Sequence, residues 1–328
     1  MTGGKGAALL AVLLLGCCAC APNGPPPAPS PASPPAASTP AIGEEPPGGS
    51  AGLTYTNLAG EAAAGRVRDI LTGAGVPAEA VDTAMDWVAD YNRCMAECPA
   101  FTLAEDFTTL DGTTVDYGDY PTMSREWYRK NGRDYHDILC RILAFQLDRH
   151  SITVEKPVSR EAFDCYDSET AWLYTDGDIL FGREKTEEHR AYRPFPLLHW
   201  EEETVADYFT LFNPVPIQGE PTPEAMLSAV REEWRSRGVS FREGGCTLIT
   251  FWTEYDGRIC ASHAAVLAEA GEKLLLFEKT NPESPYSAAL FSSAQEVRDY
   301  LYDMMALDYR QYDMEVGPFL ILQNDQPL

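Results

Sequence analysis

Three apolar runs between residues 246 and 281 predict the centre of the fold. They are separated by Asp256-Gly257 and by a second boundary centred on Ala270-Gly271. An Asp-Gly pair between such runs is a strong signal of a two-residue hairpin turn, and a short turn at the second boundary pairs the next two runs. Because apolar residues occupy both faces of these strands, we expect an antiparallel sheet covered on both sides by helices or loops.

Counting outward from the two turns aligns Thr250, His263 and Glu278 in one row across the three strands. An imidazole and a carboxylate buried without partners would cost on the order of a few kcal/mol, so we expect these two side chains to pair. A histidine held by an acid supplies the general base, and the group that orients it, for a cysteine nucleophile. Cys140 is the candidate nucleophile.

Apolar residues at helical spacing predict helices on either side of this meander, over residues 59–75, 77–98, 124–131, 138–147, 221–238 and 292–309. The last of these has a capping box formed by Ser292 or Ser293 with Glu296, and an edge strand is expected near residues 316–323. The segment from 151 to 245 is rich in Pro and aromatic residues, as in YFTLFNPVPIQGEPTP, and predicts long packed loops apart from its one helix.

These patterns predict an α+β fold in which an N-terminal helical part packs on an antiparallel sheet. We expect one domain over residues 52–328, with a helical part (59–150), a loop-rich part (151–245), and a β-meander with a terminal helix (246–328).

Cys140 lies near the start of the predicted helix at 138–147, which is apolar around most of its circumference and is therefore expected to be buried. With Asp137 as N-cap, Cys140 falls in the first turn, where free N–H groups and the helix dipole stabilise a thiolate. The negative charges of Asp134 and Asp137 disfavour the thiolate, and the positive charge of Arg141 offsets them. The alternative is that Cys140 is a small core residue.

The N-terminus predicts export. Residues 1–16 have one positive charge at Lys5 and an apolar run too short to span a bilayer, which needs about 20 residues. Leu14-Leu15-Gly16-Cys17 resembles the lipobox of bacterial lipoproteins, which implies cleavage before Cys17 and lipidation of that cysteine. The alternative is ordinary secretion with cleavage near Cys20-Ala21. Residues 17–51 are rich in Pro and nearly free of large apolar side chains, so we expect a disordered tether.

The net charge of −25 argues against nucleic acid and anionic lipid head groups as partners of the domain. Cys94 and Cys98 fall one turn apart on a helix, but no further ligands cluster near them, so two packed thiols are expected rather than a metal site. No cofactor is predicted. The remaining histidines are interpreted as surface or capping residues: His136, His150, His189 and His199.

Four stretches carry a resemblance: TYTNL near residue 54, the Cys140-Arg141 helix, SHAAVL and FEKTNPESPY. Over residues 53–310 the chain resembles a family of bacterial lipoproteins known as domain of unknown function family 4300. The order Cys on a helix, His on a strand and acid on the next strand resembles papain-like and transglutaminase-like enzymes. That resemblance implies Cys140 as nucleophile, His263 as general base and Glu278 as the orienting residue. Asn281 is a second choice of orienter.

The sequence offers no clear oxyanion-hole side chain before Cys140, which leaves only backbone N–H groups for that role. We expect a lipid-anchored extracytoplasmic protein performing thiol acyl transfer or amide hydrolysis on peptide or cell-wall amides. Two alternatives stay open. One is a non-catalytic binding or scaffold lipoprotein with His263 and Glu278 as a structural pair, and the other is a disulfide-stapled adhesin or inhibitor.

Overall fold

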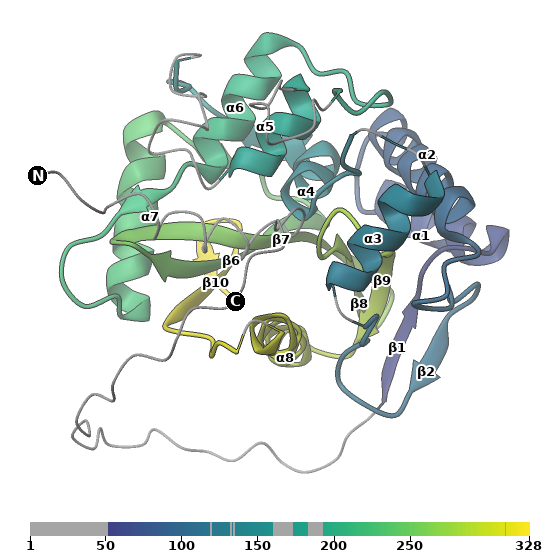
Figure 1. Cartoon of the computed structure of the whole chain (residues 1–328). Helices are drawn as coiled ribbons and strands as arrows, with labels where there is room; N and C mark the ends of the chain where they lie inside the picture. Colours follow the sequence, from purple (N-terminus) through teal and green to yellow (C-terminus); the bar gives the residue numbers. More distant parts are fainter. Residues whose placement is uncertain are drawn as a thin grey trace, which may run out of the picture.

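The structure is a computed structural model, and it describes residues 52–328 apart from residues 119, 132, 134, 160–172, 183–192 and 312. Within this part the chain forms an α+β fold around one large antiparallel sheet (Figure 1). The strands of that sheet are β1 (Leu53–Thr56), β2 (Thr108–Leu110), β4 (Val215–Pro216), β6 (Cys246–Tyr255), β7 (Arg258–Ala270), β8 (Lys273–Lys279), β9 (Tyr286–Phe291), β10 (Phe319–Gln323) and β11 (Gln326–Pro327).

The spatial order is β11-β10-β6-β7-β8-β9-β1-β2, with β4 joined to β7 outside this path. The predicted meander is therefore extended on both sides, by β10 next to β6 and by β9 and β1 beyond β8. The strand expected near residues 316–323 is β10, and β11 lies outside it at the edge. A separate two-stranded sheet pairs β3 (Ile152–Thr153) with β5 (Ser240–Phe241).

Helices cover both faces of the large sheet. They are α1 (Glu61–Gly73), α2 (Ala78–Met95), α3 (Tyr120–Asn131), α4 (Cys140–Asp148), α5 (Tyr174–Phe181), α6 (Glu202–Phe212), α7 (Pro223–Arg237) and α8 (Ala294–Arg310), with a 3-10 turn at Arg149–Ser151. Helix α8 lies alone on one face, and α4, α5 and α6 lie on the other (Figure 1). The larger core packs α1, α2 and α4–α7 on the sheet, and a smaller core lies under α8.

Helix α6 corrects the prediction that the aromatic segment around YFTLF is loop. Its buried face carries Tyr208, Phe209, Leu211 and Phe212, and its first turn contains Glu202 and Glu203, which suit the positive helix N-terminus. Helix α5 is a second helix within residues 151–245, where loops were expected apart from the helix at 221–238. The remaining helical predictions agree with the structure in outline. Every residue of α4 is buried, as its apolar circumference predicts. The Ser293 side chain caps α8, and the Glu296 carboxylate accepts from the backbone N–H of Ser292 at 2.7 Å.

The first predicted hairpin turn is correct. Tyr255 pairs with Arg258, and both turn residues, Asp256 and Gly257, have positive φ values of 48° and 75°, as a type I′ turn requires. Further along, the register shifts between Phe251 and Trp252, so that Phe251 rather than Thr250 faces His263. Ser262 is the additional residue of this β-bulge.

The second predicted turn is one residue too early. Ala270 pairs with Lys273, so the turn is Gly271-Glu272, and Gly271 has a positive φ of 72°. As a result Glu278 faces Ala265 and lies diagonally from His263 rather than opposite it. The change in pairing is two residues, which keeps Glu278 and His263 on the same face of the sheet.

Candidate functional site at the start of helix α4

Strand β7 lacks a neighbouring strand over a short stretch of one edge. Strand β6 follows the whole of the other edge, whereas on this edge β8 begins to pair only at Ala265 and β4 pairs only with Arg258 and Ile259. Between them, residues 260–264 have no partner strand here among the described residues. The guanidinium of Arg141 donates to the carbonyl of Ala261 at 2.9 Å. The start of α4 therefore meets β7 where the ladder of strands is interrupted.

Cys140 is the first residue of α4 and is 1% exposed. Leu139 is the N-cap residue, in an extended conformation, and its carbonyl accepts from the backbone N–H of Leu143. The prediction that Asp137 caps this helix is wrong, because the Asp137 carboxylate accepts from Lys279 Nζ at 2.6 Å instead. Cys140 still lies within the first turn, where backbone N–H groups lack helical partners and the dipole favours a thiolate.

His263 and Glu278 pair across the sheet as predicted. His263 Nε2 lies 2.7 Å from Glu278 Oε2, and the two side chains are 1% and 2% exposed. The other carboxylate oxygen, Oε1, accepts a hydrogen bond from the Tyr300 hydroxyl of α8. This chain of contacts fixes the imidazole through Nε2. The remaining nitrogen, Nδ1, has no oxygen or nitrogen partner in the part of the chain that the structure describes.

The thiol of Cys140 and the imidazole of His263 perturb each other. Burial raises the pKa of Cys140, but the Arg141 guanidinium and the interaction with His263 outweigh it, so the pKa is lowered. Burial lowers the pKa of His263, yet Cys140 and Glu278 together raise it to about 10. Both directions favour transfer of the thiol proton to the imidazole. The two pKa shifts thus act in the direction that a thiolate-imidazolium pair requires.

Arg141 is held by a second buried network. Its guanidinium donates to both oxygens of Asp176, at 3.0 Å and 2.5 Å, and the Tyr208 hydroxyl donates to the same carboxylate. Arg141 and Asp176 are fully buried. Such a bidentate pair has a defined geometry. It fixes a positive charge beside Cys140 and attaches the start of α4 to α5, while the hydrogen bond from Arg141 to the Ala261 carbonyl attaches it to β7.

Two further predictions about the site need correction. Thr250 is not in the row with His263, since it pairs with Ala264 and accepts from the Trp252 indole at 2.7 Å. Asn281 does not orient the imidazole, because its Oδ1 accepts the backbone N–H groups of Glu283 and Ser284 in a turn.

His136 is not a surface histidine. It is 3% exposed and contacts Tyr128 and Glu283. His150 is part-buried and lies near the carbonyl of Leu147, as a capping histidine would, and His199 is exposed.

Sequence reasoning missed the partners that other elements supply. Asp176 and Tyr300 are far from the triad in the chain, and only the fold brings them to Arg141 and Glu278. Asp308, also on α8, lies close enough to His263 for the imidazolium to lower its pKa, although burial dominates and raises it to about 6. One signal in the sequence could have indicated Tyr300. It lies on the apolar face of α8, and a tyrosine buried there needs a hydrogen-bond partner for its hydroxyl.

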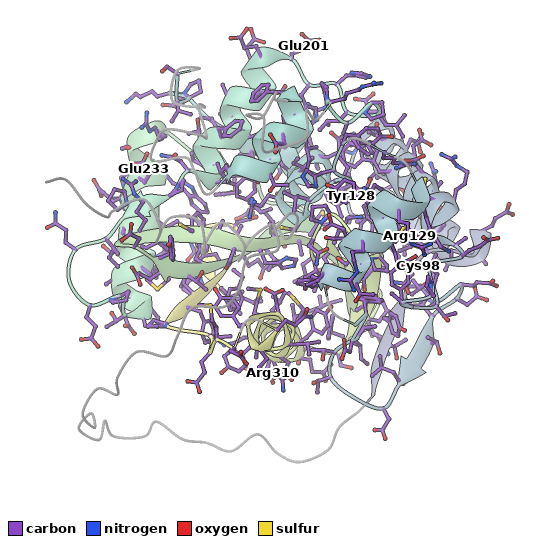
Figure 2. All side chains as sticks on the ribbon, in the orientation of Figure 1. Cys98, Tyr128, Arg129, Glu201, Glu233 and Arg310 are labelled. Carbon is purple, nitrogen blue, oxygen red and sulfur yellow. The ribbon has the colours of Figure 1, made fainter. Side chains whose placement is uncertain are left out.

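Cys94, Cys98, Cys140, Cys246 and Cys260 are free thiols in the structure. Cys98, labelled in Figure 2, is buried beyond the end of α2. The described residues include no group of three or more His, Cys, Asp or Glu placed to hold a metal ion. They also include no helix that has the length and apolar character to cross a membrane. Cys17, Cys165 and His189 lie outside the described residues.

The fold and this cluster define an α+β protein in which a cysteine at a helix start meets a His-Glu pair on an antiparallel sheet. The chain belongs to the family described as Domain of unknown function (DUF4300), whose model matches residues 54–328. No curated protein and no solved structure matches the chain.

Proposed function

We propose that this protein is a thiol-dependent enzyme that hydrolyses amides or transfers acyl groups, acting on peptide or cell-wall amides outside the cytoplasm. The observation that carries the proposal is the convergence of Cys140, His263 and Glu278 from three elements, with the pKa of the thiol lowered and that of the imidazole raised. Perturbed groups of this kind, held in a fixed relation, are typical of catalytic sites.

In the proposed reaction the Cys140 thiolate attacks the carbonyl carbon of an amide. The C–N bond breaks as the His263 imidazolium donates its proton to the leaving amine, and a thioester remains on the sulfur. His263, now neutral, takes a proton from water or from a second amine as it attacks the thioester. Hydrolysis or acyl transfer results, and the thiol is regenerated. Glu278 keeps the ring oriented and stabilises its cation in both steps.

The first turn of α4 is the proposed source of oxyanion stabilisation. The backbone N–H groups of Cys140 and Arg141 belong to the N-terminal turn, which has no earlier helical carbonyls to bond. Donors of this kind, free of helical partners, would stabilise the charge that develops on the substrate carbonyl oxygen. The fixed guanidinium of Arg141 adds positive charge on the same side.

Export and anchoring are part of the proposal. The lipobox-like sequence ending at Cys17 and the Pro-rich segment that follows support a lipid-anchored domain held away from a bacterial cell membrane. Acidic side chains such as Glu201 beside α6 and Glu233 on α7 project from the outer helices (Figure 2), which supports a partner other than nucleic acid. Metabolic labelling with a fatty-acid analogue tests the anchor, and Cys17→Ser removes the label if the proposal is right.

Selective alkylation tests the thiol chemistry, and the chain has its own controls. Cys246 and Cys260 are as buried as Cys140, at 3% and 2% exposed against 1%. Burial raises the pKa of both, to about 12 for Cys260. Iodoacetamide near neutral pH should therefore modify Cys140 well ahead of either, as read by peptide mass spectrometry. Equal labelling of all three contradicts the proposal.

The burial of the triad favours a second candidate, a binding or scaffold lipoprotein without turnover. Cys140, His263 and Glu278 are each at most 2% exposed, and a structural ion pair needs no access to substrate. The two candidates differ in the effect of Cys140→Ala. It abolishes the release of amines from peptide or peptidoglycan amides if the protein is an enzyme, and it leaves ligand binding unchanged if the protein is a scaffold.

A further inference from the structure

Lys279 is fully buried next to the triad. It follows Glu278 in β8 and points to the opposite face of the sheet. Its Nζ lies 2.6 Å from Asp137 Oδ2, 3.8 Å from the centroid of the Tyr91 ring and 4.1 Å from that of Tyr286. The ring faces attract a cation, but burial outweighs them and the Asp137 charge, and it lowers the pKa of Lys279 to about 8.

Asp137 is perturbed in the complementary direction. It too is fully buried, and burial raises its pKa in spite of the lysine beside it. Oδ1 of the carboxylate has no hydrogen-bond partner within the described ranges. The Lys279 amine, with a lowered pKa, thus lies against the Asp137 carboxyl group, with a raised pKa, and both shifts favour the uncharged forms. These are the two states that react with each other to form an amide.

Glu283 supplies a third group at the same place. Its side chain is fully buried, and neither carboxylate oxygen has a hydrogen-bond partner in the described part of the chain. Its negative charge acts on Lys279, and its Oε1 lies 3.8 Å from His136 Nδ1. A carboxylate buried without donors is costly to keep. Because its charge acts on Lys279 and its oxygens have no hydrogen-bond donor among the described residues, Glu283 is the candidate for moving a proton between the amine and the carboxyl group.

We propose that Lys279 and Asp137 are joined in the mature protein by an intramolecular amide bond formed with Glu283 as proton relay. The neutral Nζ attacks Cγ of the protonated Asp137 side chain. Glu283 takes a proton from the nitrogen and delivers it to a departing hydroxyl, so one N–C bond forms, one C–O bond breaks and one water leaves. No oxidation or reduction occurs. Aromatic walls formed by Tyr91, Trp127 and Tyr286 exclude water that would reverse the reaction.

The bond would connect positions 142 residues apart in the chain. One end is the last residue of β8, and the other precedes the first residue of α4 by three positions. It would therefore lock the segment that presents Cys140 to the strand that carries Glu278. The inference does not depend on thiol catalysis, because the three groups that form the amide are separate from the triad.

Mass spectrometry of the folded full chain, then denatured under reducing conditions, tests the bond. The mass should be lower than that of the processed sequence by one water molecule, and a digest should give a branched peptide joining the segments around residues 137 and 279. A full mass with two linear peptides from these segments overturns the inference and leaves a buried ion pair.

Matched variants make the test specific. Glu283→Gln removes the relay but keeps the shape of the side chain, so the branched peptide should fall to a minor fraction of the molecules. Lys279→Arg should abolish it, whereas Lys273→Arg, at the exposed start of the same strand, should retain it in full. Cys140→Ser should also retain it, which separates failure of this inference from failure of the proposed catalytic role. Retention of the full branched fraction in Glu283→Gln contradicts the relay.

Discussion

Replacing Glu278 with glutamine should lower the population of the Cys140 thiolate, and this effect should pass through His263. The change removes the negative charge that lies 2.7 Å from His263 Nε2 but keeps an amide oxygen able to accept a hydrogen bond. A hydrogen bond to a charged group contributes about 1.5–3 kcal/mol, roughly twice a neutral one. Loss of the charge therefore removes about 0.7–1.5 kcal/mol and lowers the pKa of His263 by about half a unit to one unit, at about 1.36 kcal/mol per unit.

The thiolate-imidazolium pair should become about three- to tenfold less populated relative to the neutral pair. The rate of Cys140 alkylation by iodoacetamide, followed by mass spectrometry across a pH series, measures this population. The rate at neutral pH should fall, and its rise should move to higher pH as the pKa of the thiol returns toward its ordinary value. Glu272→Gln is the matched control, because Glu272 is exposed in the β7–β8 turn. An unchanged pH profile in Glu278→Gln, with the fold intact by circular dichroism, refutes the reasoning.

Three stability predictions follow from the buried polar groups and are measured by urea unfolding. Arg141→Met should cost about 3–5 kcal/mol because it leaves Asp176 charged and unpaired, and adding Asp176→Asn should recover part of that loss. Burial raises the pKa of Asp148 to about 7, so wild-type stability should fall as pH rises from about 4 to 7, and Asp148→Asn should make this slope shallower and gain about 1–3 kcal/mol above pH 7, while Asp308 and Asp137 keep part of the slope. Ser293→Ala should cost about 1 kcal/mol through loss of the α8 cap. Each prediction fails if the variant unfolds at the wild-type urea midpoint at every pH tested.

The sequence predicts the local features of the sheet well. The turn at Asp256-Gly257 follows from residues that tolerate positive φ, and the apolar runs on both sides of it indicate a covered sheet. The bulge at Ser262 leaves no comparable signal, because serine fits a regular strand as well as a bulge. It depends on how β6 and α4 pack against β7, which is tertiary information.

The pairing of His263 with Glu278 was predicted although the register was not. The error at the second turn changes the pairing by an even number of residues, so the two side chains stay on one face. The bulge at Ser262, by contrast, adds a single residue, so Ala261 and Ala265 on either side of it face opposite sides of the sheet. Ala261 packs in the larger core with the helices, whereas Ala265 packs in the smaller core under α8. A face assigned by counting from the first turn is therefore wrong beyond the bulge.

The role of Asp137 shows where local rules fail. An aspartate before an apolar helix is a good N-cap, yet here its carboxylate binds a lysine that is 142 residues further along the chain. A buried amine without a partner costs more than a missing cap, so the long-range contact takes the carboxylate. The same reason explains why Asp176 and Tyr300 could not be assigned from the sequence.

The last two residues of β8 face opposite layers of the molecule, with Glu278 holding the imidazole and Lys279 holding the segment that leads into α4. One extra residue in the Gly271-Glu272 turn would exchange the two sides. His263 would then lose its contact with Glu278, and the segment before Cys140 would lose the contact between Asp137 and Lys279, although no side chain had been substituted. The register of β8 therefore positions both the His263 base and the segment that leads to Cys140. A shift of that strand by one residue cannot change one of them without changing the other.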